Sequence, residues 1–405
     1  MPENLHLKMV NFSRGAYIIV EGKADAEYFF IIRSGNVRVS KEVEVVQEEG
    51  GNVLGPGDFF GVVASMSGHS QIETVQALTD CSMISVHKDN FGDLIVKNTP
   101  VAMKIIQGFS RRMRYLDEAL ARMSMKESSP PGSEHLFLVG EFYAKQSQYN
   151  LAHYALHHYL KLHPDGMNAA AATERLNKIK DLSSVVHLET SDNEFNREYP
   201  ANTMVFCEHM PGSELYIIQK GSVKITKITN NTEVMLAILK PGDIFGEMSL
   251  IEDKLRSASA ITFEETQLLA VNRENFARMV STQPQVVARL TRLLAERIWL
   301  IYKQLANTLL TNKVGRLYDA LLIQLEKERL TMREGEAYAF SFGANELINM
   351  VGLPVAEGRL ALRDLLRNTR IKIVDNKIYT SSRAEIEKQA KYYRKLQRIE
   401  RSRSS

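Results

Sequence analysis

The chain has 405 residues, of which 44% are hydrophobic and 24% charged, and a formal net charge of +3. This length predicts roughly three or four domains with ordinary apolar cores, and so small a net charge indicates no class of partner. No run approaches the roughly 18 apolar residues that a membrane span needs, and Met1 to Val10 lacks an apolar signal segment, so we expect a cytoplasmic protein without a membrane partner. The two cysteines, Cys81 and Cys207, exclude a four-cysteine metal site and a disulfide scaffold.

The first part of the chain has the pattern of a small β-domain. Runs rich in β-branched and aromatic residues lie at 17–20, 29–32 and 37–39, with turns marked by Gly22 and Gly35. Several short strands of this kind predict a sandwich or barrel. A helix is predicted to follow from about residue 99, because one apolar stripe of period 3.6 is formed by Val101, Ile105, Ile106, Phe109, Met113, Leu116 and Leu120.

A linker and a helical segment come next. Two prolines and a glycine at 128–133 end any helix there. Residues 134–180 are predicted to be helical and carry one tetratricopeptide-like pattern, in which Ala152 lets two helices approach closely. One such repeat cannot build a solenoid, which needs about three. We therefore expect a spacer that docks on a neighbour and offers a surface for a protein partner.

The same helical segment contains a possible metal-ligand spacing. His153 and His157 lie four residues apart, and two histidines at that spacing are able to hold zinc. No carboxylate or cysteine stands at a fixed offset to complete the set. We therefore interpret the histidines as an exposed helix face and expect no metal.

The β-pattern then returns as a second copy of the first. Residues 199–223 repeat 12–37, and Pro241 to Gly246 repeats Pro56 to Gly61. A helix is again predicted to follow, at 284–310, with an apolar side formed by Val287, Leu290, Leu293, Leu294, Ile298, Ile301 and Leu305. The pattern predicts one β jelly-roll module with a trailing helix, present twice.

The C-terminal part has the outline of a winged helix-turn-helix. Helices are predicted to 328, at 344–351 and at 355–368, and a hairpin follows at 371–379. Asp375 and Asn376 tolerate the positive φ that a two-residue hairpin turn requires. From Arg383 onward, Lys and Arg outnumber Glu by five, which predicts a basic tail that contributes phosphate contacts or is a solvated helical surface.

The strongest motif lies in the second copy. Phe245-Gly246-Glu247-Met248-Ser249-Leu250, followed by Arg256-Ser257-Ala258, resembles the phosphate-binding cassette of cyclic-nucleotide-binding domains. The resemblance implies a glycine for close backbone approach, amides that attract an anion, a glutamate for ribose and an arginine for the cyclic phosphate. It also implies a residue of the following helix against the base. The implied ligand-binding residues are Gly246, Glu247, Met248, Ser249, Arg256, Ser257 and Tyr302.

One departure and two alternatives accompany this expectation. Leu255 stands where the family often has proline, which removes some loop rigidity but no contact. The alternative is a surface salt bridge between Glu247 and Arg256 in an inert module. For Tyr302 and the neighbouring Trp299, packing between helices is an equal alternative.

The first copy lacks both charged positions of the cassette. Val62 stands at the glutamate position and Gln71 at the arginine position. Losing a charge-assisted hydrogen bond costs about 1.5–3 kcal/mol, so a cyclic nucleotide is not expected to bind there. We expect a structural or dimerising role, with a less anionic ligand as the alternative.

Residues 345–354 resemble the first helix and turn of the catabolite activator (Crp/Fnr) family. The resemblance implies that the next helix enters the major groove of DNA. Its usual base-reading positions hold Val355, Ala356 and Leu360, which cannot distinguish guanine by hydrogen bonds, and Gly358 weakens the helix by on the order of 1 kcal/mol. The candidate DNA-binding residues are Val355, Ala356, Glu357, Arg359, Arg363 and Lys377.

Together these patterns predict an α+β, non-enzymatic transcription regulator of the Crp/Fnr type. Its expected effector is a cyclic nucleotide, with cyclic AMP favoured over cyclic GMP, and its expected partner is DNA. The predicted organisation is a degenerate module at 1–126, a spacer at 133–182, a cyclic-nucleotide-binding module at 188–310, a winged helix-turn-helix at 311–382 and a basic tail at 383–405.

Several alternatives remain at this point. A homodimer is expected because the apolar stripe of 284–310 needs a partner, unless it pairs with 99–122 in the same chain. A nucleotide-sensing adaptor that recruits a protein is the main alternative function. A regulatory subunit of a kinase and a haem-based gas sensor are further ones.

Overall fold

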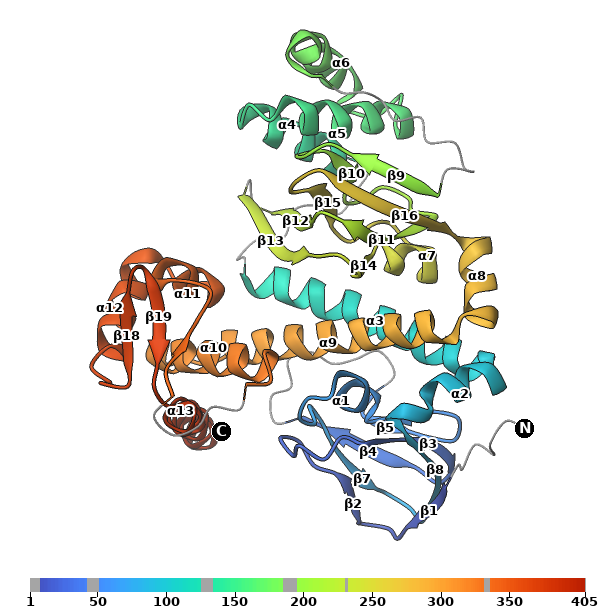
Figure 1. Cartoon of the computed structure of the whole chain (residues 1–405), viewed down its shortest axis with the longest axis vertical. Coiled ribbons are helices and arrows are strands. Elements are labelled where there is room, and N and C mark those ends of the chain that lie inside the picture. The colour runs from blue at the N-terminus through green and yellow to red at the C-terminus, as the bar shows by residue number, and fades with distance from the viewer. Residues whose placement is uncertain are drawn as a thin grey trace. The chain divides into compact units, whose positions relative to one another are not determined.

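The computed structural model describes residues 8–41, 51–124, 134–184, 195–229, 232–330 and 336–404 (Figure 1). Within the described residues, the first β-module has eight strands in two antiparallel sheets, in the orders β1-β8-β3-β6 and β2-β7-β4-β5. The two sheets enclose one core, in which Val37 and Met83 are fully buried. Helix α1, Val62–Ser67, connects β6 to β7. The strands are β1 Lys8–Phe12, β2 Tyr17–Ile19, β3 Tyr28–Ser34, β4 Val37–Ser40, β5 Val53–Leu54, β6 Phe59–Phe60, β7 Thr74–Ala77 and β8 Cys81–His87.

The second β-module repeats this arrangement strand for strand. Its sheets have the orders β9-β16-β11-β14 and β10-β15-β12-β13, and α7, Glu247–Glu252, takes the place of α1. The internal repeat of the sequence therefore corresponds to a repeat of topology. The strands are β9 Asn196–Tyr199, β10 Met204–Phe206, β11 Glu214–Lys220, β12 Val223–Thr229, β13 Thr232–Leu239, β14 Ile244–Phe245, β15 Ser259–Thr262 and β16 Thr266–Asn272.

Two helices follow each module. They are α2 Phe91–Lys97 and α3 Thr99–Ser124 after the first, and α8 Arg273–Thr282 and α9 Pro284–Thr308 after the second. The apolar stripes predicted on the long helices are buried in this single chain, with Ile105 and Met113 on α3 and Val287 and Ile298 on α9 all at 0% exposure. The single chain covers these side chains itself, which is the alternative to a homodimer that the sequence left open.

Three helices form the spacer, α4 His135–Lys145, α5 Tyr149–Leu162 and α6 Ala169–Ile179. A side chain at Gly140 would stand 2.5 Å from Leu156, so this glycine lets α4 and α5 approach closely. The core of the three helices continues into the second β-module through Cys207 and Ile261, and Figure 1 shows the helices over that module. The spacer thus docks on the module that follows it in the sequence.

The C-terminal part combines helices with a small antiparallel sheet of order β17-β19-β18. The hairpin turn occurs as predicted, with Asp375 at φ +48° and Asn376 at φ +59° between the paired residues Val374 and Lys377. The elements are α10 Lys313–Lys327, β17 Tyr338–Ala339, α11 Ala344–Met350, α12 Val355–Leu365, β18 Ile371–Val374, β19 Lys377–Thr380 and α13 Arg383–Ser404.

Helix α13, which carries the basic residues from Arg383 onward, packs against the rest of the C-terminal part. Its residues Ile386 and Ala390 are fully buried, and Arg394 donates to the carboxylate of Asp319, which is 1% exposed. Gln397 accepts from the amide of Thr311 and donates to the carbonyl of Leu309. The segment is therefore an integral helix of the C-terminal part, fixed to the connection between α9 and α10.

The chain divides into two compact units that do not follow the sequential segments. One contains Met1–Lys88, Tyr115–Ser124 and Ala295–Ser405, and the other contains Asp89–Arg114 and Met125–Leu294. Helices α3 and α9 therefore each contribute one end to each unit. Within the described residues, none of the helices combines the length and the apolar character that crossing a bilayer requires.

Packing between two helices explains why glycine occupies position 358 on α12, although glycine has a low helix propensity. A Cβ atom there would lie 2.3 Å from Cγ2 of Ile348 on α11, and a β-branched side chain cannot move that atom away freely. The glycine thus permits α11 and α12 to pack in contact.

The first prediction concerns this glycine. Gly358→Ala should destabilise the protein by about 1–3 kcal/mol in urea unfolding, because overpacking outweighs the better helix propensity of alanine. Gly92→Ala on α2 is the matched control, since nothing lies within 4 Å of a Cβ there, and it should stabilise by up to about 1 kcal/mol. A stabilising Gly358→Ala would contradict the close packing of α11 on α12.

Candidate functional site

The predicted cassette begins with a glycine in a conformation that other residues avoid. Strand β14 ends at Phe245, Gly246 has φ +77°, and α7 begins at Glu247. A side chain at Gly246 would also stand 2.6 Å from Nη1 of Arg256. Both the backbone turn and the approach of the arginine therefore require glycine at this position.

Arg256 lies at the centre of the cassette with its guanidinium buried. The residue is 5% exposed, and Nη1 and Nη2 donate to the carbonyls of Gly246 at 2.6 Å and Glu214 at 2.8 Å. The guanidinium carbon lies 4.0 Å from the ring centre of Phe206. Burial lowers the pKa of Arg256, while the charges of Glu247 and Glu214 act to raise it. Nε is buried without a hydrogen-bond partner, so one donor of a charged group is left for a ligand.

The other cassette residues surround this arginine. Glu247 and Ser249 are each 1% exposed, and the Ser249 hydroxyl donates to the carbonyl of Gly246 at 3.1 Å. Met248 is buried, and the hydroxyl of the half-buried Ser257 lies 3.7 Å from its sulfur. The structure thus brings together six of the seven residues that the sequence predicts for this site.

The connection between β10 and β11 forms a wall of the cassette. The amide of His209 donates to the carbonyl of Arg256, and the amide of Arg256 donates to the carbonyl of Met210. A side chain at Gly212 would lie 2.3 Å from Nε of Arg256 and 2.5 Å from Oγ of Ser249. The backbone of this connection therefore lies directly against the two side chains.

Arg114 is a contact that sequence reasoning missed. This residue of α3 donates from Nη1 to the carbonyl of Leu255 at 3.1 Å, directly beside Arg256. The helix that follows the first β-module thus reaches the cassette of the second. No local sequence pattern predicts a contact between Arg114 and Leu255, because the two residues lie far apart in the sequence.

Tyr302 is the seventh predicted residue, and the unit that contains it also contains the first β-module. Its hydroxyl donates to Oε1 of Glu21 at 3.2 Å, so it lies against the first β-module. The physical reason is the length of α9, whose 25 residues span about 37 Å. The helix enters the unit of the first β-module at Ala295, and Trp299 stacks there on His69 at 4.0 Å.

A pocket of the first β-module lies beside Tyr302. It holds about 730 Å³, including solvent at its mouth, and its lining includes Glu21, Gln71, Tyr302, Lys303, Arg394 and Arg398. Gln71 is 3% exposed and donates to the carbonyl of Asp25 at 3.1 Å. Burial raises the pKa of Glu21 to about 7, and Glu73 adds to this, against the hydrogen bond of Tyr302 and the charges of Lys303 and Lys41. With Val62 and Gln71 at the cassette positions, this module has no counterpart of the Glu247–Arg256 pair.

The candidate DNA-binding residues lie on α12 and its hairpin. Ala356, Arg359, Arg363 and Lys377 are exposed, whereas the side chain of Val355 lies outside the described residues. Glu357 forms an ion pair with Lys313 at 3.0 Å. Leu360 is 56% exposed on the same helix. Helix α12 thus presents two cations and a large apolar side chain to solvent.

Comparison with known proteins gives matches in both β-modules. The family model described as "Cyclic nucleotide-binding domain" matches residues 9–98 and 196–283. The CRP-like cAMP-activated global transcriptional regulator of Mycobacterium tuberculosis strain H37Rv is 29% identical over 197 residues, which cover 48% of this chain and 87% of that protein. The cyclic AMP receptor protein of Thermus thermophilus is 39% identical over 103 residues, 25% of this chain and 48% of that protein. Among solved structures, the catabolite activator protein of Thermus thermophilus matches with 29% identity and a TM-score of 0.27, covering 49% of this chain and 90% of that one.

The second prediction concerns Glu21. Because its pKa is raised in the folded state, its stabilising contribution is complete below the ordinary value of 4.5 and is lost as pH rises through about 7. Urea unfolding between about pH 4.5 and pH 7.5 should show wild type losing stability relative to Glu21→Gln, which keeps an acceptor for Tyr302. Glu265→Gln removes an exposed carboxylate as the control and should follow wild type. Parallel curves for wild type and Glu21→Gln would contradict the raised pKa.

Proposed function

Because the cyclic nucleotide-binding domain match and the CRP-like relatives support the Crp/Fnr family, we propose that this chain is a cyclic-nucleotide-responsive transcription regulator. The effector binds in the second β-module at Gly246, Glu247, Met248, Ser249, Arg256 and Ser257. The observation that carries the proposal is the buried guanidinium of Arg256 with an unpartnered Nε, beside the buried carboxylate of Glu247. In this proposal both β-modules are jelly rolls, 133–182 is a tetratricopeptide-like spacer and 311–382 is a winged helix-turn-helix.

The chemistry of the cassette fits a ligand that is anionic at one end and hydroxylated beside it. A cyclic phosphodiester carries one negative charge on two free oxygens, which a guanidinium binds in a planar, bidentate way. Glu247, one residue past Gly246, supplies an acceptor for a ribose hydroxyl. The carbonyls of Gly246 and Glu214 accept from Arg256, so phosphate oxygens would replace or supplement these acceptors. The names of the relatives favour cyclic AMP over cyclic GMP.

The first β-module has a structural role in this proposal. Val62 replaces the acid and Gln71 the arginine, so a phosphate would meet no permanent charge at either position. The module instead receives the end of α9 and belongs to the same unit as the C-terminal part.

The C-terminal part provides the DNA-binding function. Helices α11 and α12 are joined by a tight turn with Gly352 at φ +61°, and the hairpin β18–β19 follows, as in a winged helix-turn-helix. Arg359, Arg363 and Lys377 are exposed and able to contact phosphates. Helix α9 runs from the unit of the cassette to the unit of α12, so a ligand that prefers one arrangement of this helix biases the arrangement of the reading helix.

A nucleotide-sensing adaptor is the second candidate function. The observation that favours it is Leu360, which is 56% exposed where the family usually reads bases with a charged side chain. An exposed leucine on a helix is typical of protein recognition rather than of hydrogen bonding to guanine.

The third prediction tests the effector site. Arg256→Leu should weaken binding of cyclic AMP by roughly 100-fold or more, because two charge-assisted hydrogen bonds are lost. Thermal-shift and calorimetric titrations with cyclic AMP and cyclic GMP measure this, and Arg256→Lys should be intermediate because it keeps the charge but not the fork. Gln71→Leu is the matched control in the first β-module and should bind as wild type does. An equal loss in Gln71→Leu would show that the division of roles between the two modules is wrong.

The fourth prediction separates DNA binding from the adaptor function. Binding to a mixed-sequence duplex should weaken as salt rises, and Arg359→Ala with Arg363→Ala should reduce the slope of log K against log[salt] by about 0.9 for each phosphate contact removed. Lys23→Ala with Arg33→Ala removes two exposed cations from the first β-module and should leave the slope unchanged. Unchanged slopes for both double variants, or no DNA binding with cyclic AMP present, would favour the adaptor.

A further inference from the structure

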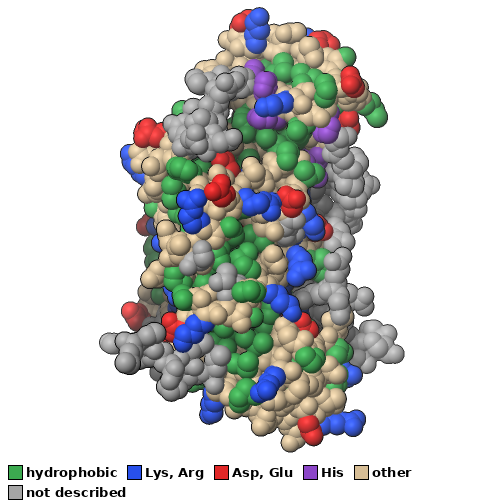
Figure 2. All heavy atoms as spheres, turned by 90° about the vertical axis from the view of Figure 1, so that its right-hand side faces the viewer, with side chains coloured by type: hydrophobic (Ala, Val, Ile, Leu, Met, Phe, Trp, Pro, Cys, Tyr) green, Lys and Arg blue, Asp and Glu red, His purple; other side chains and the backbone are tan. Residues whose placement is uncertain are grey.

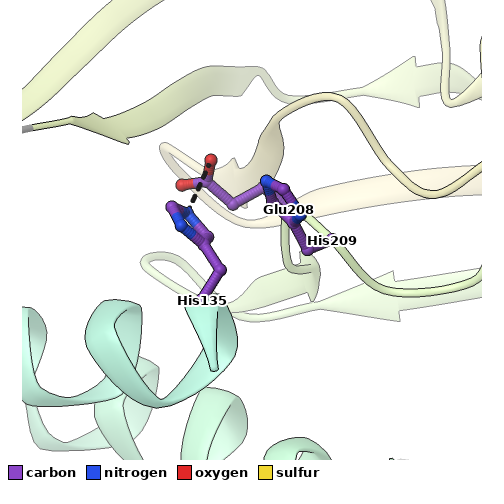
Figure 3. Close-up of side chains that lie close together, drawn as sticks. All are labelled: His135, Glu208 and His209. Carbon is purple, nitrogen blue, oxygen red and sulfur yellow. Dashed lines mark ion pairs between the residues drawn. The ribbon is translucent and has the colours of Figure 1, made fainter. Parts of the chain in front are cut away.

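Among the described residues, one group of three side chains has the types and spacing of metal ligands. It consists of His135 at the start of α4, and Glu208 and His209 directly after β10. Figure 3 shows the ring of His135 directed at the carboxylate of Glu208, with His209 beside them. The ligand atoms of the three residues all lie within 4.8 Å of one another, and Nε2 of His135 is 3.2 Å from Oε2 of Glu208.

Two of these groups are deeply buried and incompletely satisfied. His135 is 4% exposed and Glu208 is 0% exposed. One carboxylate oxygen, Oε1, accepts from the amide of Ile228 at 2.7 Å. The other, Oε2, and Nε2 of His135 have no hydrogen-bond partner. A cation between a buried carboxylate oxygen and a buried imidazole nitrogen gives each of these atoms the partner that it lacks.

The conformation of His209 points in the same direction. This residue has φ +64°, in the left-handed region that favours glycine, and its counterpart in the first β-module is Gly22 at φ +82°. Glu21 precedes that glycine as Glu208 precedes His209, yet in the first module the acid pairs with Tyr302. The second module thus holds a histidine in a strained position where the same topology elsewhere in the chain uses glycine.

We propose that His135, Glu208 and His209 bind one divalent transition-metal ion, with Zn²⁺ as the best fit. Two imidazoles and one carboxylate are a recognised three-residue zinc set that leaves one position for water. Ligand bonds of about 2.0–2.2 Å place tetrahedral ligand atoms about 3.3 Å apart. Because the three ligand atoms all lie within 4.8 Å of one another, no pair has to close by more than about 1.5 Å on binding. His209 is partly exposed, and rotation of its side chain provides that movement.

Such an ion joins the spacer to the wall of the nucleotide cassette. His135 belongs to α4 of the spacer, whereas the amide of His209 donates to the carbonyl of Arg256. Three residues further on, Gly212 lies against the guanidinium of Arg256 and the hydroxyl of Ser249. Metal binding therefore fixes the connection that borders Arg256, and we expect it to change nucleotide affinity. This second step rests on the proposed function of the cassette, and metal binding itself does not.

The fifth prediction tests the ligand set with the full chain, stripped by a chelator and titrated with ZnCl₂ in a calorimeter. Wild type should bind one equivalent, and Co²⁺ should give the visible absorption of a four-coordinate site. His209→Gly is the decisive variant, because it restores the residue type of the first module: it should melt at the same or a higher temperature yet bind Zn²⁺ at least 10-fold more weakly. Glu208→Gln, which keeps the acceptor for Ile228, should also weaken binding.

His153→Ala with His157→Ala is the matched control, since it removes the histidine pair that the sequence suggests on α5. Figure 2 shows histidine side chains gathered over the spacer helices, so adventitious binding there has to be separated from the proposed site. Unchanged Zn²⁺ affinity in His209→Gly, or loss of binding in the α5 double variant instead, would overturn the assignment.

Nucleotide titrations with and without bound Zn²⁺ test the second step. A change of affinity that disappears in His209→Gly supports the coupling, and equal affinities refute it. Arg256→Leu separates the two proposals, because it should lose cyclic AMP binding while keeping Zn²⁺ binding. If the wild-type protein does not bind cyclic AMP, the proposed function of the cassette is wrong. The metal site is then still decided by the Zn²⁺ titrations.

Discussion

The buried guanidinium of Arg256 is the interaction around which the cassette of the second β-module is arranged. A permanent positive charge at 5% exposure needs acceptors nearby, and the backbone carbonyls of Gly246 and Glu214 provide them, while the charge of Glu247 favours the charged arginine. The first β-module has the same strand order with Val62 and Gln71 at these positions. The double-sheet frame therefore forms without the charge.

Each β-module is completed by the long helix that follows the other one. Arg114 of α3 reaches the carbonyl of Leu255 beside the cassette, and Tyr302 of α9 reaches Glu21 in the first module. The apolar stripes of both helices are buried within the one chain. An exchange of this kind is what a symmetric dimer achieves with two identical chains, and here a duplicated sequence achieves it within one. A residue of one module can then differ from its counterpart in the other, because the two modules are separate segments of the sequence.

The sequence was most informative where function depends on neighbouring residues. The cassette from Gly246 to Ser257 and the turn at Asp375–Asn376 are short segments whose residue types follow from backbone conformation and local chemistry. The internal repeat was visible for a similar reason, since strand alternation and glycine turns recur at the same intervals. Six of the seven predicted ligand-binding residues come together because they belong to one turn, one short helix and the connection that follows it.

Contacts between distant segments were decided by the tertiary structure. The position of Tyr302 depends on where a long helix passes from one unit to the other, and no periodicity encodes that point. Gly358 looked like a defect in a helix until the contact with Ile348 gave it a reason. The approach of His135 to Glu208 depends on how the spacer docks, as does the packing of α13 on α10 for Arg394 and Asp319. The sequence by itself determined the strands, the helices and the chemistry of the cassette, because period and turn type are local properties. The tertiary structure decided which helix serves which module and which buried charges meet, because these depend on packing between surfaces that the sequence does not place next to each other.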